Sequence, residues 1–444
     1  MKKLFTFPIA LALAAPVMAE GLHIFRCSED GIPGQTEPML MGFAISADAR
    51  YVCGTIQQGG GIFVADCLTG EVKWNADGED SSELRAVDNR GVGVGFIDED
   101  GVLFSFASGE PSYITAPEGV RYVQGEGISN DGSVMAGSFT MKSFSTVAAF
   151  SVDGAPWANL PIPSDEELGC LKAYLNSFSA AKFVSGDGNV ILGHLGNFTF
   201  PIVWKRNASG EYEADFFPIR YVKGVEEDRY DESKPLYALS GTYTCLSNNG
   251  RYAATVGAVA DETNTYTRIV PVVYDIQEKS IKIYDAPQVI DQFEAGLFPR
   301  SIADDGTFIG TIGETAAEYN FGCFIWKAGE EQAELYIEAF PEFSKMLGEA
   351  DVLGQNVPTG ISADGQHIVG YAYYSKDYDI TSEEPAYYVT YLISLDGSGV
   401  ETFRLTPAEA PGAIYSIDGR SLSGLQKGLN IVRNADGSIT KILK

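Results

Sequence analysis

The segment Gly127-Ile-Ser-Asn-Asp-Gly-Ser-Val-Met-Ala-Gly137 carries the pattern that decides the fold. A short strand runs into an Asp-Gly turn, and a second strand leaves the turn and ends at a glycine. Asp bonds its own backbone in such turns and Gly takes the positive φ. The pattern occurs seven times, and the other copies are residues 44–54, 87–95, 183–193, 245–255, 301–310 and 360–370. A repeat of this kind indicates units that bury their apolar faces only by stacking on one another.

Each copy is followed by an apolar strand, a tight turn and usually a further alternating strand. In the fourth unit these are Pro201–Trp204, Ser209-Gly-Glu211 and Tyr212–Phe217, and in the seventh the last strand is Val400–Leu405. Four strands per unit are typical of a propeller blade. The sequence therefore predicts an all-β fold, a seven-bladed β-propeller. Six or eight blades also fit, because Arg90-Gly91 and Asn249-Gly250 replace Asp-Gly in two copies.

The repeat resembles the HAF family of extracellular repeats and, more loosely, TolB-type propellers, whose blades also begin with a strand, Ser-x-Asp-Gly and a strand. The likeness covers only the turn and its flanking strands in each blade. It implies the propeller fold and export from the cytoplasm. It implies no particular activity, since those families share none.

Residues 1–19 have the features of a secretory signal peptide. Lys2 and Lys3 precede a short apolar core, and Ala19 is a small residue at the expected cleavage point. We therefore expect a mature chain that begins at Glu20 and is secreted to the periplasm, the cell surface or the medium. No later segment is apolar for long enough to cross a bilayer, so no membrane insertion is expected.

The predicted propeller spans residues 20–410, and a tail of different composition spans residues 411–444. The tail resembles the end of the C-terminal sorting domain of type IX secretion systems. The resemblance rests on Tyr415, Gly419, Arg420, Gly428, Ile431, Val432 and Lys441. Asn430 stands where that family usually has tyrosine, and only about half of a full sorting domain is present. An active export signal and a short β-hairpin appendage are both left open.

The charge of the chain excludes some partners. It has 31 basic and 60 acidic residues, a net charge of −29. Nucleic acid and anionic membranes bind proteins chiefly through their phosphates, so neither is an expected partner. The six cysteines allow disulfides, with Cys53 and Cys67 in one hairpin, but Cys53 also occupies a core position of the repeat. No His-Cys pair has metal-ligand spacing, so no metal or cofactor is expected.

The loops sort by length onto two faces. Turns between strands one and two and between strands three and four are tight, whereas the long connections fall on the opposite face. Loops on a rigid scaffold often bind ligands. Aromatic and polar side chains in these loops suit a glycan or protein ligand. The candidate binding residues are Phe198, Tyr266, Arg268, Tyr319, Phe321, Tyr373, Asp377 and Tyr378. An alternative is that tyrosine is simply common at strand edges.

Catalytic signatures are sparse. The chain has only His23, His194 and His367, which gives a Ser-His-Asp or Cys-His arrangement little to build on. The turn residues Asp48 and Asp131 are expected to form turns and not to bind ligands. The sequence favours a binding or interaction module. The alternative is an extracytoplasmic polysaccharide-active enzyme, a hydrolase or lyase with paired carboxylates. No catalytic residue is assigned, and the ligand, the oligomeric state and the disulfide pairing are left open.

Overall fold

The structure is a computed structural model, and the part of the chain that it describes is a set of ranges. These are residues 21–25, 39–57, 60–76, 81–163, 178–196, 200–217, 220–221, 237–260, 266–286, 289, 296–313, 320–340, 356–374, 387–395, 413–416, 421–422, 429–433 and 439–443. The chain divides into two units, residues 1–399 and 400–444. We describe each unit by itself.

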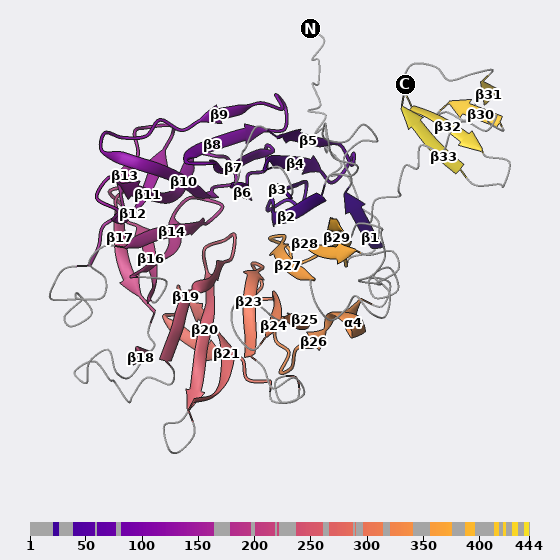
Figure 1. Ribbon diagram of the computed structural model, residues 1–444. Helices are drawn as coiled ribbons and strands as arrows, with labels where there is room; N and C mark the ends of the chain where they lie inside the picture. Colours follow the sequence, from indigo (N-terminus) through magenta and orange to yellow (C-terminus); the bar gives the residue numbers. More distant parts are fainter. Residues whose placement is uncertain are drawn as a thin grey trace, which may run out of the picture. The chain divides into compact units, whose positions relative to one another are not determined.

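Seven sheets make up the first unit, and they are antiparallel apart from one short parallel pair in blade five (Figure 1). Blades one to three are β2 (Met39–Ile45) to β5 (Val72–Asn75), β6 (Ser82–Val87) to β9 (Pro111–Tyr113), and β10 (Val120–Ile128) to β13 (Ala158–Asn159). Between these ends lie β3 (Tyr51–Gln57), β4 (Ile62–Asp66), β7 (Val92–Ile97), β8 (Asp100–Ser105), β11 (Val134–Met141) and β12 (Thr146–Val152). In each blade the strands pair in chain order.

The remaining four blades follow the same order, with additions. Blade four is β14 (Ser179–Val184), β15 (Val190–Leu195), β16 (Phe200–Arg206) and β17 (Tyr212–Phe216). Blade five is β18 (Arg220–Tyr221), β19 (Tyr237–Leu246), β20 (Tyr252–Ala260), β21 (Tyr266–Asp275) and β22 (Ser280–Ile283). Blade six is β23 (Gly296–Ile302), β24 (Phe308–Gly313), β25 (Asn320–Trp326) and β26 (Glu334–Leu335), followed by the short helix α4 (Tyr336–Ala339). Blade seven contains β27 (Val357–Ile361), β28 (His367–Tyr374) and β29 (Tyr387–Ser394).

The blades form a closed ring. Each inner strand contacts the inner strand of the next blade, and β27 of blade seven contacts β2 of blade one. The seven-bladed β-propeller that the repeat predicts is therefore confirmed, and each copy supplies the first two strands of one blade.

The outer strand of blade seven is a correction to the sequence prediction. The N-terminal strand β1 (Gly21–Phe25) pairs antiparallel with β29, from Gly21 opposite Ser394 to Phe25 opposite Thr390. The predicted strand Val400–Leu405 lies outside the described residues, and its expected place beside β29 is occupied. The two ends of the first unit thus complete one sheet, which closes the ring through pairing between distant segments.

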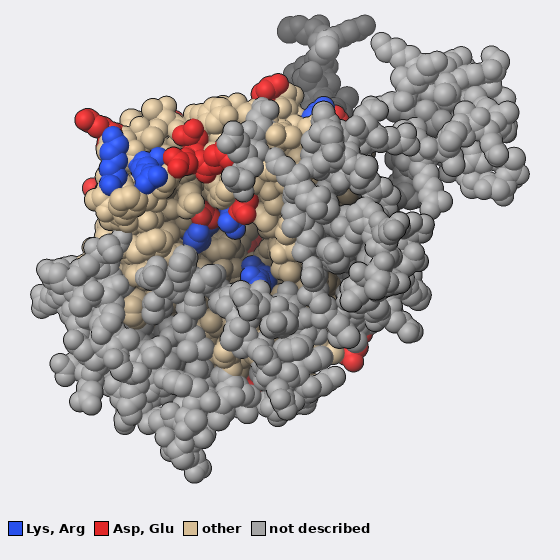
Figure 2. Space-filling view, viewed as in Figure 1, with Lys and Arg blue, Asp and Glu red and all other residues tan. Residues whose placement is uncertain are grey.

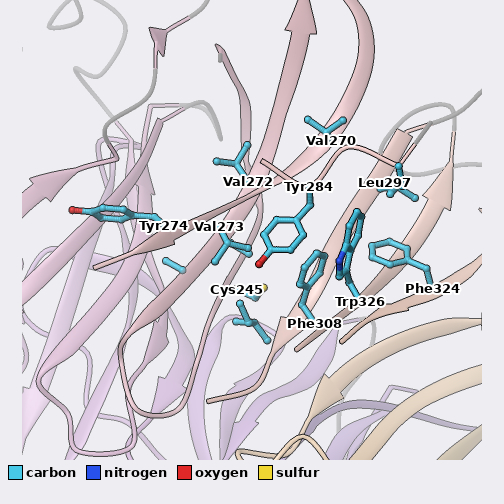
Figure 3. Close-up of a cluster of buried hydrophobic side chains, with 14 of the residues drawn as sticks. Cys245, Val270, Val272, Val273, Tyr274, Tyr284, Leu297, Phe308, Phe324 and Trp326 are labelled. Carbon is cyan, nitrogen blue, oxygen red and sulfur yellow. The ribbon is translucent and has the colours of Figure 1, made fainter. Parts of the chain in front are cut away.

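Apolar side chains fill the spaces between blades, as the boundary between blades five and six illustrates (Figure 3). Tyr284 packs edge-on against Phe308 and Trp326, with ring centroids 4.9 Å apart in both pairs. Phe308 and Trp326 stack at 5.9 Å. Trp326 donates its indole N–H to the Glu330 carbonyl at 3.0 Å, so this buried ring keeps its polar group paired.

The glycine that ends the repeat has a structural cause. In six blades the inner strand has a β-bulge opposite this glycine, and the bulge brings a carbonyl group of the inner strand over it. A Cβ at the glycine would lie closer than 3.0 Å to that carbonyl oxygen. The six glycines are Gly54, Gly95, Gly137, Gly193, Gly310 and Gly370. Only glycine permits this approach of two backbones.

Blade five has Thr255 in place of this glycine, and its inner strand differs accordingly. Ser240 pairs with Val256 and Cys245 with Ala254, so residues 241–244 of β19 stand opposite Thr255 alone. The wider irregularity moves the inner strand away from the Thr255 side chain, which is fully buried. The exception supports the same steric rule.

The second unit contains a four-stranded sheet in the order β31 (Ser421–Leu422), β30 (Ala413–Ser416), β32 (Leu429–Arg433) and β33 (Ile439–Leu443). β30 pairs with both β31 and β32, and β32 pairs with β33. The sequence left open a short β-hairpin here. The structure instead has four strands, and β30, which contains Tyr415, is an inner strand of this sheet.

Two further expectations concern the described residues. Cys53, Cys67, Cys245 and Cys323 are buried and free, so the possible Cys53–Cys67 disulfide is not formed. Burial raises the pKa of each of these four thiols, to about 12 for Cys245. None of the helices described here is long and apolar enough to span a bilayer.

Candidate functional site: the axis of the ring

The Asp-Gly turns on one face of the ring have structural roles, as the sequence predicts. In blade three the Asp131 carboxylate accepts hydrogen bonds from Ser129 Oγ at 2.9 Å and from the Ser133 N–H at 2.9 Å. Bonds from Ser133 and Ser129 lower the pKa of Asp131 to about 2. Gly132 takes φ of +69°, and in blade one Ala49 holds the same place at +60°. The turn carboxylates are engaged by their own turns.

These seven turns are joined by a closed ring of hydrogen bonds. At most blade boundaries the hydrogen bond is donated by the residue that precedes the turn Asp. Five boundaries have backbone bonds, namely Asn89 N to Asn130 O, Asn130 N to Gly186 O, Gly186 N to Asn248 O, Asp304 N to Ala363 O, and Ala363 N to Ala47 O, at 2.6–3.2 Å. The other two run from Asp48 N to Asn89 Oδ1 and from Asn249 N to Asp304 Oδ1. The turn face is therefore tied together around the axis.

Amide side chains fill part of this turn ring. The Asn130 and Asn248 side chains meet over Gly186, where an added Cβ would lie closer than 3.0 Å to both. Burial raises the pKa of Asp304, against opposing hydrogen bonds from Asn249 and Asn248. With tight turns and interlocked amides, the described part of this face offers little depth for a ligand.

Four residues before each position of the turn ring lies the bulge of the inner strand. We call these seven positions the axial tier: Phe43, Arg85, Glu126, Lys182, Thr244, Arg300 and Thr359. The offset of four is the same in every blade, from Phe43 and Ala47 to Thr359 and Ala363. A bulged residue is left out of regular pairing and its side chain is re-aimed. Because the inner strands surround the axis, the tier is one level of the axial wall.

Side chains of the axial tier contact one another across blade boundaries. Lys182 Nζ lies 2.5 Å from Glu126 Oε1, in blades four and three. The Arg85 guanidinium lies 5.6 Å from the centroid of the Phe43 ring, in blades two and one, and also pairs with Glu83. Thr359 Oγ1 donates to the Gly42 carbonyl of blade one at 2.8 Å. Figure 2 shows a hollow in the described surface with basic and acidic side chains on its wall.

Groups suited to proton transfer are scarce in the described chain. His194 on β15 is fully buried, stacks on Phe178 at 5.7 Å, and has its pKa lowered to about 4 by burial and by the nearby Lys182 charge. His367 is 6% exposed. Within the described ranges, no three His, Cys, Asp or Glu side chains are placed to hold a metal ion. The carboxylates of Glu126 in the axial tier and of Glu83, two residues from Arg85, are each paired with a cation.

A platform formed by the exposed Phe144 and the half-buried Tyr122 lies on the opposite face from the turn ring, at the connections of blades two and three. Phe144, in the β11–β12 connection, is 72% exposed and has φ of +65°, a strained conformation for a bulky side chain. The Arg121 guanidinium lies 5.3 Å from the Phe144 ring centroid and 4.6 Å from that of Tyr122. Arg121 also faces Glu99 at 3.9 Å. This cation links the two rings.

A separate groove of about 450 Å³ lies at the rim between blades two and three, lined by Tyr113, Trp157 and neighbouring apolar residues. Tyr113 is 58% exposed. The groove lies among outer strands, away from the axis, so it provides a comparison surface for the axial site.

The binding residues predicted from the sequence are not tested by this structure. Phe198, Tyr319, Asp377 and Tyr378 lie outside the described residues. The backbones of Tyr266, Arg268, Phe321 and Tyr373 belong to β21, β25 and β28, but their side chains are not described. They stay predictions.

Sequence reasoning missed the axial tier and the Phe144 platform. The signal for the tier was present, since every repeat ends in glycine or, in one case, threonine, and glycine within a strand often marks a bulge. Counting back four residues from the residue before each turn Asp, or its replacement, then gives the seven positions of the axial tier. For Phe144 the sequence holds no comparable signal, because its exposure and positive φ follow from the shape of one connection.

Comparisons with known proteins give structural neighbours only. No family model and no curated protein matches the chain. Among solved structures, an oligogalacturonate lyase from Vibrio parahaemolyticus is similar at 10% identity and a TM-score of 0.50, covering 86% of this chain and 99% of that one. TolB from Acinetobacter baumannii is similar at 13% identity and 0.38, covering 65% of each chain. The β-propeller domain of the Trilobed protease from Pyrococcus furiosus is similar at 10% and 0.43, covering 83% and 99%. The chain is an all-β, seven-bladed propeller by its own sheets, and TolB is among the solved structures that it resembles.

Proposed function

We propose that this protein is an extracytoplasmic binding module that takes a glycan or protein ligand from the face opposite the Asp-Gly turns. The observation that carries the proposal is the closed ring of seven blade-to-blade contacts at the turn face. With that face tied together, a ligand that uses the axis enters from the side of the longer connections. The leader-like residues 1–19 support the location.

The chemistry of the described side chains supports binding in preference to catalysis. His194 is neutral and buried at pH 7, and the four described thiols are buried with raised pKa values. By contrast, Phe144 and Arg121 present an exposed aromatic ring and a cation on the proposed face. Rings stack on the apolar faces of sugars, and polar groups fix the orientation. The name of the Vibrio lyase says that it acts on an oligogalacturonate, which supports a glycan as the proposed ligand here.

Retention on glycan and peptide arrays tests the proposal. Phe144→Ala should lower retention, since one exposed ring contributes about 1 kcal/mol of stacking. The combined change of Tyr266, Tyr319, Phe321 and Tyr378 to Ala should abolish it. Tyr113→Ala is the matched control, because that ring is also exposed but lies at the rim. Loss of retention with Tyr113→Ala alone would move the site to the rim groove. Release of new sugar ends during incubation would instead indicate a polysaccharide-active enzyme.

A further inference from the structure

We propose that the axial tier binds an acidic oligosaccharide, one whose sugar units carry carboxylates. This inference rests on the proposed function and names its ligand class. It concerns the residues Arg85, Lys182 and Arg300 in particular, which the sequence reasoning did not single out.

The axial tier differs in charge from the rest of the chain. The whole chain has about half as many basic as acidic residues, 31 against 60, yet the axial tier has three cations and one acid, and Glu83 beside Arg85 brings the acids to two. Solubility explains acidic side chains on an outer surface and does not explain cations gathered on the axis. A tier of this sign attracts an anionic ligand and repels a cationic one.

The seven blades differ from one another at the bulged residue. The bulge itself follows from backbone geometry, because a glycine opposite it permits the close carbonyl in six blades. The bulged side chain is not fixed by that geometry, since Phe43, Arg85, Glu126 and Thr359 all occupy the same structural position. Burial of the tier is also incomplete, with the Arg85 side chain 41% exposed and that of Lys182 27% exposed. The fold therefore leaves this tier free to carry binding chemistry.

The axial tier combines cations with an aromatic ring. The Arg85 guanidinium offers a planar set of donors that matches a carboxylate, and it is held by Glu83 and lies beside the Phe43 ring. Phe43 in turn lies 6.0 Å from the Tyr371 ring, edge to face. The Glu126 carboxylate, 6% exposed, positions Lys182 in the same way that Glu83 positions Arg85. Cations beside aromatic rings suit a sugar ring that bears a carboxylate.

Titration calorimetry with tetragalacturonate tests this inference directly. The matched ligand is the same tetramer with every carboxylate methyl-esterified, which removes the charge and keeps the sugar. We expect binding of the acid form only, weakened by added salt because salt screens charge. Arg85→Gln should weaken binding about tenfold or more, as the loss of a charge-assisted hydrogen bond does. Arg85→Lys should recover part of the loss.

Arg206→Gln provides the control. Arg206, on β16, donates through Nε to the Gly210 carbonyl at 3.1 Å in an exposed turn of blade four, so this change also removes one positive charge. It should leave the affinity unchanged, and thermal melts of all variants report whether they fold. Equal binding of the esterified tetramer would overturn the inference and leave the proposed function standing. Binding of poly-glutamate without binding of tetragalacturonate would also overturn the inference and leave the proposed function standing. Absence of any retained glycan or protein ligand on the arrays would overturn both.

Discussion

Gly193 on β15 lies under the carbonyl group of Ala180 on β14, so close that a Cβ at residue 193 would be within 3.0 Å of that oxygen. The same relationship recurs in five other blades. It connects three features of this chain: the glycine that ends each repeat, the bulge of the inner strand, and the residue of the axial tier that occupies the bulge.

Gly193→Ala should therefore destabilise the ring strongly. The added methyl meets backbone and not a flexible side chain, so we expect a loss of about 3 kcal/mol or more in the free energy of unfolding. Gly154→Ala is the matched control. Gly154 has φ of +72° but nothing within 4 Å of an added Cβ, so only backbone strain of about 1 kcal/mol is expected. Urea unfolding measures both changes, and equal losses would show that the close carbonyl does not matter.

Deletion of residues 21–25 should open blade seven. Without β1 the edge of β29 loses its pairing partner, and an unpaired edge favours association with other chains. We expect a lower melting temperature and a tendency to aggregate, measured by calorimetry and light scattering. Deletion of residues 411–444 is the control, since these residues belong to the second unit and the body should melt within a few degrees of the full chain. An unchanged melting transition after the first deletion would mean that β1 does not close the ring.

Sequence reasoning predicted the seven blades because the repeat is local. Ser129, Asp131 and Gly132 specify a turn within five residues, and each turn begins one blade. Closure by β1 is not local. Gly21 pairs with Ser394, and no short pattern near either residue announces a partner so far along the chain.

The candidate site was less predictable than the fold. Aromatic residues in the long loops, such as Tyr266 and Tyr378, were the predicted binding residues, and their side chains are not described by the structure. The axial tier can be recognised only when the inner strand is known to bulge. Arg85 and Thr359 look like ordinary strand residues in the sequence. The bulge becomes evident only from the close carbonyl oxygen that makes glycine necessary at positions 95 and 370. The conformation of Phe144 depends on one connection and had no sequence signal.

Stability should fall as the pH is lowered from about 6.5 to about 4, in part because of His194. The pKa of His194 is lowered from 6.5 to about 4 in the folded protein, by burial first and by Lys182 second. In this window the unfolded chain takes up a proton that the folded chain does not, so unfolding is favoured, by up to roughly 3 kcal/mol at the lower end.

His194→Gln removes that titration, and its free energy of unfolding should depend less on pH between 6.5 and 4 in urea titrations. The turn carboxylate of Asp131 acts in a lower window, since its pKa falls from 3.8 to about 2. If the free energy of unfolding of the variant depends on pH as steeply as that of the wild type, the loss of stability comes from other titrating groups.

Hydrogen exchange with and without saturating tetragalacturonate locates the ligand on the ring. We expect slower exchange in peptides that contain the bulges of β6, β10 and β14, and in the β11–β12 connection that carries Phe144. Exchange in the outer strands β9 and β13 should not change. Protection confined to the Asp-Gly turns or to the rim groove between β9 and β13, with the inner strands unaffected, would contradict binding at the axial tier.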